Sequence, residues 1–236
     1  MNLYKLDPHV HTSETSACGR IPGGELAHRY KKAGFDAIVI TDHFTPDFFA
    51  SLEGLAWEEK VDRFLAGYRE AAASGDKIGI SVLLGLELRF CGDPNDYLVY
   101  GADRRFLVEN PLLLELGLKQ FARISRDEGF LIYQAHPFRQ GIAAADPALL
   151  DGVEVYNANP RHESRNHLAY RLAQDNGLRM LSGSDCHQLE DLGQGGIVVA
   201  ERVRTVRELI DILREGRIEE FIGIGSSSAS LSAGEA

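Results

Sequence analysis

The sequence predicts an α/β protein in which parallel strands close into a barrel. Short, continuously apolar segments alternate with amphipathic segments along the 236-residue chain, which is typical of strand–helix–strand units. The apolar segments lack a period of two, as expected for strands covered on both faces. This length suits one closed barrel, and no proline- or serine-rich linker divides the chain. We expect one domain over residues 1–224 and a flexible tail over residues 225–236.

Eight apolar segments are predicted as strands. Most are rich in Val, Ile, Leu or Tyr, and apolar runs of four to eight residues fit buried strands. The first strand ends in His9 and His11, and the others cover residues 37–41, 81–88, 97–100, 130–134, 152–156, 179–182 and 196–200.

Five segments between the strands are predicted as amphipathic helices, because their apolar residues recur at helical spacing. They cover residues 25–33, 58–73, 116–128, 165–176 and 205–215. A glycine follows each helical segment and is its predicted C-cap, since glycine adopts the left-handed backbone without strain. These glycines are Gly34, Gly75, Gly129, Gly177 and Gly216.

The composition argues against several classes of protein. The formal net charge is −10, so a nucleic-acid polymer is not an expected partner, because such binding relies on a basic surface. No apolar stretch resembles a secretory signal or reaches the length of a transmembrane helix. The three cysteines, Cys18, Cys91 and Cys186, are widely spaced, which suits a reducing compartment. We therefore expect a cytoplasmic protein without a membrane partner.

Imidazole and carboxylate groups recur where the predicted strands end. Parallel barrels bring the C-terminal ends of their strands to one rim, where active sites are built. Side chains at positions i and i+2 of an extended segment point to the same face, so His9 and His11 can meet at one point, as can Asp185 and His187. Mixed imidazole and carboxylate ligands suit zinc, manganese or iron. The sequence therefore predicts a metal site on the rim.

Five short motifs follow one another at these strand ends. They are Asp7–Thr12 (DPHVHT), Ile40–His43 (ITDH), Gly85–Glu87 (GLE), Ala135–Pro137 (AHP) and Gly183–His187 (GSDCH). Each motif alone is a weak signal, but in this order and spacing they resemble the successive motifs of the PHP family, the polymerase and histidinol phosphatase domains. The resemblance covers most of the chain.

The resemblance implies a distorted (β/α)7 TIM-like barrel that hydrolyses phosphate esters. It also implies two or three divalent metal ions, zinc, manganese or iron, that activate a bridging hydroxide. Carried over by position, the implied ligands are His9, His11, Glu87 and Asp185 for the first ion, Glu87 and His136 for the second, and His43 and His187 for the third.

Two positions depart from the family's pattern. Cys18 stands where the family usually has an Asp or His that binds the third ion. A thiolate can bind zinc or iron but suits manganese less well, so either Cys18 is a ligand or the third ion is weak or absent. Asp96 stands where a His usually binds the second ion, and a carboxylate is a plausible replacement. Both residues are candidate ligands.

Further polar residues near the rim are candidates for catalysis and substrate binding. Asp42 points away from the ligand that follows it and is expected to orient a ligand from behind. Guanidinium groups bind phosphate bidentately, and Arg20, Arg139 and Arg161 all follow predicted strands. Arg139 is the preferred clamp and, with Asp42, a candidate catalytic residue. Asn157 and Asn159 are expected either to line the mouth of the site or to turn the chain.

The leading hypothesis is a metal-dependent phosphoesterase that acts on a small phosphorylated metabolite or nucleotide. The resemblance also permits a histidinol-phosphate phosphatase, or a metal-binding regulatory domain with little catalysis, because Cys18 and Asp96 depart from the pattern. An amidohydrolase is less favoured, since no lysine stands at a predicted strand end to act as a carbamylated ligand. Neither the substrate nor the oligomeric state follows from the sequence.

Overall fold

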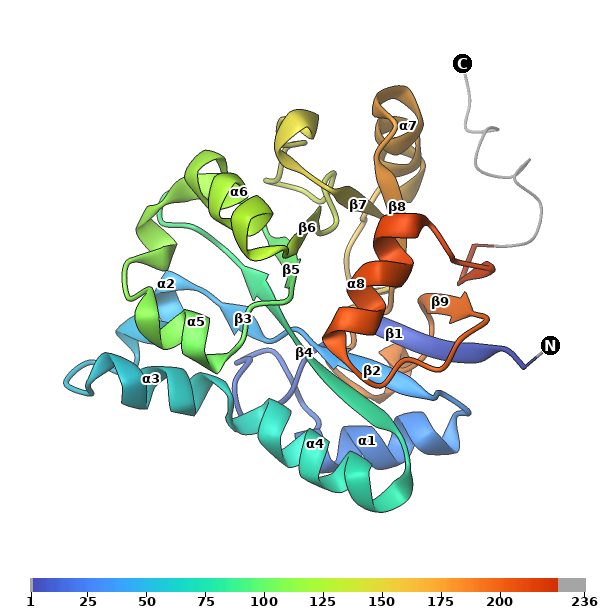
Figure 1. Ribbon diagram of the computed structural model, residues 1–236, viewed down its shortest axis with the longest axis horizontal. Helices are drawn as coiled ribbons and strands as arrows, with labels where there is room; N and C mark the ends of the chain where they lie inside the picture. The colour runs from blue at the N-terminus through green and yellow to red at the C-terminus, as the bar shows by residue number, and fades with distance from the viewer. Residues whose placement is uncertain (1, 225–236) are drawn as a thin grey trace.

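The computed structural model describes residues 2–224, in which a ten-stranded sheet curls into a nearly closed barrel (Figure 1). The α/β barrel predicted from the sequence is therefore confirmed, whereas the predicted tail at residues 225–236 lies outside the described residues. The strands are β1 (Tyr4–Val10), β2 (Ala37–Ile40), β3 (His43–Phe44), β4 (Ser81–Leu88), β5 (Tyr97–Tyr100), β6 (Leu131–Gln134), β7 (Gly152–Asn157), β8 (Arg179–Gly183), β9 (Gly196–Val199) and β10 (Glu220–Ile222).

The barrel comes close to closure where the end of β1 pairs with the segment after β8. The strand order is β10-β9-β1-β2-β4-β5-β6-β7-β8, with β3 paired to β4. Val10 and Cys186 form a parallel bridge, in which His11 N donates to Cys186 O at 3.0 Å and Cys186 N donates to His9 O at 3.3 Å. The His-x-His segment and the Asp-x-His segment therefore lie side by side.

Some strands are antiparallel, which corrects the prediction of a parallel sheet. β5 is antiparallel to β4 and β6, and β9 is antiparallel to β1 and β10. Residues 89–96 alone join β4 to β5, which is shorter than the dozen or so residues that a parallel crossover needs. Because β5 runs in the opposite direction, its beginning lies on the rim formed by the ends of β4 and β6. This reversal brings Asp96 to the rim.

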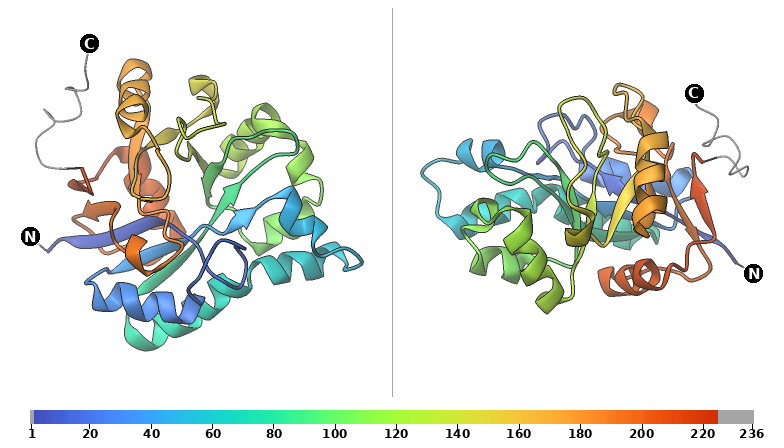
Figure 2. Two further views of the ribbon diagram at one scale, coloured as in Figure 1. Left: turned by 180° about the vertical axis from the view of Figure 1, so that it is seen from behind. Right: turned by 90° about the horizontal axis from the view of Figure 1, so that it is seen from above.

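Helices cover the outside of the sheet (Figures 1 and 2). α1 and α4 pack side by side and α7 packs on β7. None of the helices in the described part of the chain is long and apolar enough to cross a membrane. The helices are α1 (Gly23–Lys32), α2 (Pro46–Ala50), α3 (Trp57–Phe64), α4 (Ala66–Ile78), α5 (Arg104–Glu109), α6 (Gly117–Glu128), α7 (Asn166–Asn176) and α8 (Val206–Glu215), with short 3-10 turns at Leu113–Glu115, Pro147–Leu149 and Leu189–Asp191.

Helix α8 packs against the barrel end opposite the rim. It begins with a capping box, in which Glu208 N donates to Thr205 Oγ1 at 3.2 Å and Thr205 N donates to Glu208 Oε2 at 2.9 Å. Its apolar face is buried among strand residues from around the barrel. This cluster includes Leu209, Ile212 and Leu213 of the helix and Leu6, Leu83, Tyr100, Leu181 and Ile197 of the strands.

The predicted helix over residues 58–73 is two helices, α3 and α4, and this boundary corrects the sequence prediction. The break at Leu65 lets Gly67 pack against Thr12, where a Cβ atom would lie 1.8 Å from Thr12 Oγ1. Gly75 is inside α4 rather than at its end, and Gly79, with φ of 73°, is the C-cap. Periodicity could not reveal this break because both helices bury the same face. The short elements β3, β10, α2 and α5 were also not predicted.

Candidate metal centre

Ligand-type side chains from distant parts of the chain meet inside the rim. They come from the ends of β1 and β4, from β3, from the residue before β5, and from the segments after β6 and β8. All the predicted ligands except Cys18 fall into three groups whose donor atoms lie within 4.8 Å of one another. The groups are His9, His11 and Asp185; Glu87, Asp96 and His136; and His11, His43 and His187.

The first group has the spacing of a tetrahedral ion site once Glu87 is included. His9 Nε2 lies 3.4 Å from Asp185 Oδ1 and 3.5 Å from Glu87 Oε1. His11 Nε2 lies 3.3 Å from Asp185 Oδ1 and 3.3 Å from Glu87 Oε2. Donor atoms around a tetrahedral zinc ion with ordinary bond lengths are about 3.4 Å apart. His9 and His11 therefore each lie at about this distance from both carboxylates, with a different oxygen of Glu87 facing each histidine.

The donor atoms of this group also lack other partners. Within the described residues, His9 Nε2, His11 Nε2 and Glu87 Oε2 are buried atoms without a hydrogen-bond partner. Buried polar atoms are nearly always paired, and each exception calls for a reason, such as an ion. A divalent cation at the centre of the group would satisfy all three atoms. The residues therefore fit the metal ions that the sequence implies.

The second group joins Glu87 to His136 and Asp96. His136 Nε2 lies 3.0 Å from Glu87 Oε1 and 3.9 Å from Asp96 Oδ2. Both Asp96 oxygens also accept hydrogen bonds from Arg89, at 2.8 Å and 2.7 Å. Burial and the nearby Glu87 carboxylate raise the pKa of Asp96. An ion held here would share Asp96 with Arg89, a residue that the sequence did not single out.

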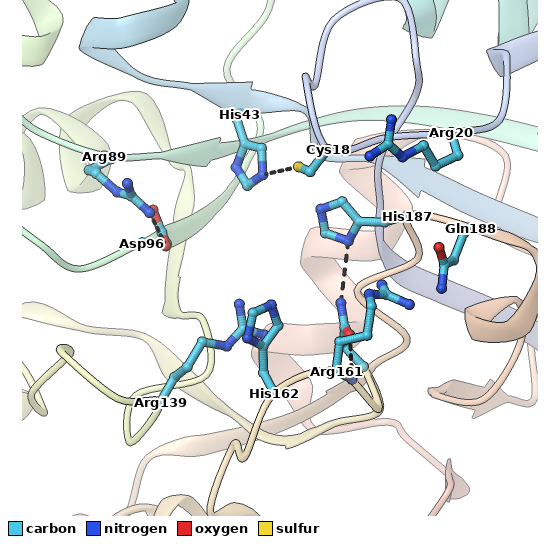
Figure 3. Close-up of a pocket in the computed structure, with 11 residues that line it drawn as sticks. Cys18, Arg20, His43, Arg89, Asp96, Arg139, Arg161, His162, His187 and Gln188 are labelled. Carbon is cyan, nitrogen blue, oxygen red and sulfur yellow. Dashed lines mark hydrogen bonds and ion pairs between the residues drawn. The ribbon is translucent and has the colours of Figure 1, made fainter.

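The third group is a stack of imidazoles beside Cys18. The ring centroid of His11 lies 4.4 Å from that of His43 and 4.3 Å from that of His187. Cys18 Sγ lies 3.2 Å from His43 Nε2 (Figure 3). Burial opposes ionisation of Cys18, but hydrogen bonds with His187 and His43 outweigh it and lower the thiol pKa to about 6. Cys18 thus lies next to the group in which the resemblance places it.

A buried glutamate in β7 positions His9 from behind. Glu154 Oε1 lies 2.8 Å from His9 Nδ1, which places the Nδ1 proton on the side of Glu154 and leaves Nε2 free to face the ligand group. The other oxygen, Oε2, accepts from His136 N at 3.0 Å and from Asn157 Nδ2 at 2.9 Å. Glu154 therefore links a ligand of the first group to a ligand of the second.

Asp42 is buried and linked to His11 through Ser16, and its place among the candidate catalytic residues stays a prediction. Its carboxylate accepts from Thr12 N, Thr12 Oγ1 and Ser16 Oγ, each at 2.7 Å. Ser16 Oγ in turn lies 3.1 Å from His11 Nδ1. Burial raises the pKa of Asp42 to about 6. The expectation that Asp42 orients a ligand from behind matches this geometry.

Two of the candidate ligands have a left-handed backbone. His136 has φ of 30° and Asp185 has φ of 51°. Side chains other than glycine reach this region only at a cost of about 1–3 kcal/mol, and such positions concentrate at functional sites. Glu154 holds the backbone N–H of His136, and Arg139 Nη2 donates to Asp185 Oδ2 at 2.7 Å. Surrounding contacts thus keep both ligands in place.

Burial and charge set the ionisation of the cluster. Burial works against a charged His9, but nearby carboxylates, foremost Glu154, outweigh it and raise the pKa of His9 well above its ordinary value. Burial and the adjacent imidazoles lower the pKa of His11 well below its ordinary value. The histidines hold the pKa values of Glu87 and Asp185 well below their usual range despite burial. Both carboxylates are therefore ionised at neutral pH and can hold a cation.

A pocket of about 340 Å³ opens onto the ligand groups, and arginines form much of its wall (Figure 3). Arg20 lines the pocket and has no ion pair with another described residue, and its role as a substrate clamp stays a prediction. Arg139 also lines it while bound to Asp185. His162 lies in the wall outside the three groups. The pocket is lined by Cys18, Arg20, His43, Arg89, Asp96, Arg139, Asn159, Arg161, His162, His187 and Gln188.

Two predicted substrate-binding residues are engaged with the protein instead. Asn157 is buried beneath the pocket, where Nδ2 donates to Asp185 Oδ2 at 3.2 Å and Oδ1 accepts from Arg139. The expectation that it lines the mouth is therefore wrong, and Asn159 takes that position. Arg161 lines the pocket, but both its Nη atoms donate to the Asp191 carboxylate at 2.6 Å. Its guanidinium fork is therefore not free.

The positioning residues were harder to find than the ligands. Glu154 is a fully buried carboxylate within the apolar run Gly152–Tyr156, and a lone acid in such a run is a signal that could have been used. Asp7, also fully buried, accepts from Tyr30 Oη at 2.7 Å and from Ser184 N at 3.2 Å. Nothing local in the sequence pairs Asp7 with these two distant residues.

Comparison with known proteins supports a PHP relationship. Residues 163–218 match the family model described as PHP-associated. No curated protein matches the chain. A similar solved structure is a two-domain protein from Bacteroides vulgatus that contains a predicted PHP-like metal-dependent phosphoesterase, with a TM-score of 0.68 and 18% identity. That match covers 92% of this chain, which spans only 64% of the length of the Bacteroides protein.

Two further solved structures have similar folds over nearly their whole length. A predicted metal-dependent phosphoesterase from Bifidobacterium adolescentis has a TM-score of 0.51 at 16% identity, with 88% of this chain and 95% of that chain covered. An amidohydrolase from Chromobacterium violaceum, with bound sulfate and no metal, has a TM-score of 0.55 at 17% identity, with 95% and 99% covered. At these identities the likeness concerns the fold.

Proposed function

We propose that this chain belongs to the PHP family and is a metal-dependent phosphoesterase that hydrolyses a small phosphorylated compound. The PHP-associated match at residues 163–218 and the fold shared with a PHP-like structure support this proposal. The observation that carries the proposal is the set of unpartnered, buried donor atoms around Glu87. These atoms belong to adjacent ligand groups, at the base of a pocket with an arginine-rich wall.

The residues present fit two ions that share Glu87. His9, His11 and Asp185 would hold one ion, and His136 with Asp96 would hold the other. Divalent ions in such a pair would lower the pKa of water and neutralise phosphoryl oxygens. The chain's own carboxylates and imidazoles set the positions of both ions.

The pocket wall is suited to a phosphate group. Arg20 and Arg139 reach the pocket from opposite sides of the ligand groups (Figure 3), and guanidinium groups form strong, oriented hydrogen bonds with phosphate oxygens. Arg139 lines the pocket while its Nη2 atom donates to Asp185 and to Asn157. An anionic substrate would thus be held by the arginines while its reacting phosphorus lies over the ligand groups.

Phosphate esters fit this pocket better than amides. The fold alone does not decide, because an amidohydrolase has a similar one. Among the described residues that line the pocket there is no lysine, so a carbamylated lysine ligand has no counterpart here. The departures at Cys18 and Asp96 give no ground for a non-catalytic regulatory domain, because both residues place donor atoms beside the ligand groups.

The proposal is tested by activity assays on metal-free protein that is loaded separately with zinc, manganese and iron. The panel contains phosphomonoesters, including histidinol phosphate, a generic phosphodiester and an amide. We expect hydrolysis of a phosphate ester that a chelator stops and added metal restores. Hydrolysis of the amide alone, or no turnover of any ester by metal-loaded protein, would overturn the proposal.

Arg20 provides a test of the pocket wall. The Arg20→Ala variant is expected to raise KM for the phosphate ester roughly 10- to 100-fold, because a hydrogen bond to a charged group contributes about 1.5–3 kcal/mol. The kcat value should change less, since Arg20 contacts the ligand groups only through its backbone, where its N–H donates to His187 O, and the substitution leaves that bond in place. Steady-state kinetics check this, with Arg123→Ala on the exposed face of α6 as control. An unchanged KM would remove Arg20 from the binding site.

A further inference from the structure

Cys18 meets two histidines from other parts of the barrel. It lies on the loop between β1 and α1, whereas His43 belongs to β3 and His187 follows β8. Its Sγ atom lies 3.2 Å from His43 Nε2, and its thiol also contacts His187. Figure 3 shows the three side chains pointing toward one another at one side of the pocket.

The orientation of His43 leaves one nitrogen for this contact. His43 Nδ1 lies 2.7 Å from Glu87 Oε2, so Nε2 is the nitrogen that faces the sulfur. A histidine whose other ring nitrogen faces a carboxylate is the common arrangement for a metal ligand. In a tetrahedral zinc site, a sulfur and an imidazole nitrogen lie about 3.5 Å apart, close to the separation seen here.

A second observation at this place also points to an ion. His11 lies between the rings of His43 and His187, whose centroids are 5.8 Å apart. The His11 side chain is fully buried, and its Nε2 has no hydrogen-bond partner within the described residues. Three imidazoles this close repel one another when protonated. A donor atom of each of these three histidines lies within 4.8 Å of the other two, although His11 Nε2 also faces Glu87 and Asp185 of the first group.

The donor atoms of Cys18, His43 and His187 differ in kind from those of the groups around Glu87. Those groups offer imidazole nitrogen and carboxylate oxygen, which accept manganese as well as zinc and iron. Sulfur is softer, and thiolate ligands select zinc over manganese. The side chains of Cys18, His43 and His187 also line the pocket, so an ion held by them would keep an open position toward the substrate, as catalytic zinc sites do.

We propose that Cys18, His43 and His187 form a thiolate-containing site that is selective for a soft divalent ion such as zinc, beside imidazole and carboxylate sites that discriminate less against manganese. This inference deepens the proposed function, because it assigns the third ion its ligands and its selectivity. It depends on metal binding but not on the identity of the ester.

The test is cobalt spectroscopy on the full-length protein. Metal-free protein is titrated with Co²⁺, and a near-ultraviolet charge-transfer band from thiolate to cobalt is expected. The band should disappear in Cys18→Ser and persist in the matched control Cys91→Ser, which removes an exposed cysteine outside the pocket. Circular dichroism establishes that each variant is folded. A band that survives in Cys18→Ser, or none in the wild type, would overturn the inference.

Competition between metals tests the selectivity. Protein loaded with zinc is dialysed against excess Mn²⁺, and the ions that remain are counted by elemental analysis. The wild type should retain one zinc ion per chain, whereas Cys18→Asp should lose it. In Cys18→Ser, the zinc affinity of this site should fall by more than the roughly 10- to 100-fold that loss of an outer-shell partner costs. Equal retention by wild type and Cys18→Asp would contradict the selectivity.

The outcomes separate this inference from the proposed function. If cobalt binds with visible absorption bands and the protein hydrolyses an ester, but no thiolate band appears, the thiolate site is absent and the phosphoesterase stands. If the thiolate band appears and no ester is hydrolysed, the metal site stands and the proposed function fails. If no cobalt binds, both fail.

Discussion

Glu87→Gln is expected to reduce ester hydrolysis by more than the roughly 10²–10³-fold that loss of one preorganised electrostatic group costs. Glu87 is fully buried, and its two oxygens contact His9, His11, His43 and His136 at 2.7–3.5 Å. The amide keeps the shape but removes the charge and one acceptor oxygen. Ions on both sides of Glu87 would therefore be weakened together, and kcat should fall with the number of bound ions.

The control for this variant is Glu53→Gln, which makes the same chemical change on an exposed residue. Both variants should unfold at temperatures close to that of the wild type without metal. The measurement is kcat together with bound metal. If Glu87→Gln kept its ions and its rate, Glu87 could not be the shared ligand.

Glu154→Gln is expected to weaken metal binding about 10- to 100-fold, the usual cost of losing an outer-shell partner of a histidine ligand. The carboxylate accepts from His9 Nδ1 and so keeps Nε2 free. An amide N–H at that position would favour a proton on Nε2, which faces the first ligand group. His136 would also be disturbed, because its backbone N–H donates to the other oxygen of Glu154.

This effect is measured by calorimetric titration of metal-free protein with zinc. An excess of zinc should restore most of the activity of Glu154→Gln, because all the ligands remain, whereas Glu87→Gln should not recover. An unchanged zinc affinity would show that His9 is held in place without Glu154.

The ligand positions could be predicted because they follow from chain order. His9, His11, Glu87 and Asp185 stand at or just beyond strand ends, and a barrel brings such ends to one rim. The structure brings these four side chains together. Cys18 and Asp96 were harder to place because each lies in a loop, and only the structure shows that both lie beside the groups.

The positioning residues could not be predicted from the chain alone. Glu154 acts across the barrel on His9, 145 residues away, and the contact depends on the register of β7 against its neighbours. Asn157 and Arg161 were assigned to the substrate because loop polarity does not reveal the partner of a side chain. In the structure, Asn157 donates a hydrogen bond to Asp185, and Arg161 donates to Asp191.

The sheet direction was the largest error in the predicted fold. The sequence of a short apolar strand does not reveal whether the strand runs parallel or antiparallel to its neighbours, and β5 is apolar throughout. The short connection at residues 89–96 was the informative feature, because it leaves no room for a crossover helix. Asp96 stands on the rim only because of this reversal.

The most direct measurement is a titration of metal-free protein with zinc or manganese in which bound ions and the rate of phosphate-ester hydrolysis are recorded together. Hydrolysis should be absent without metal, appear as the two ions that share Glu87 bind, and vanish again with chelator. Full activity in metal-free protein, or stable binding of these ions without turnover of any phosphate ester, would contradict the assignment of this site to metal-dependent phosphoester hydrolysis.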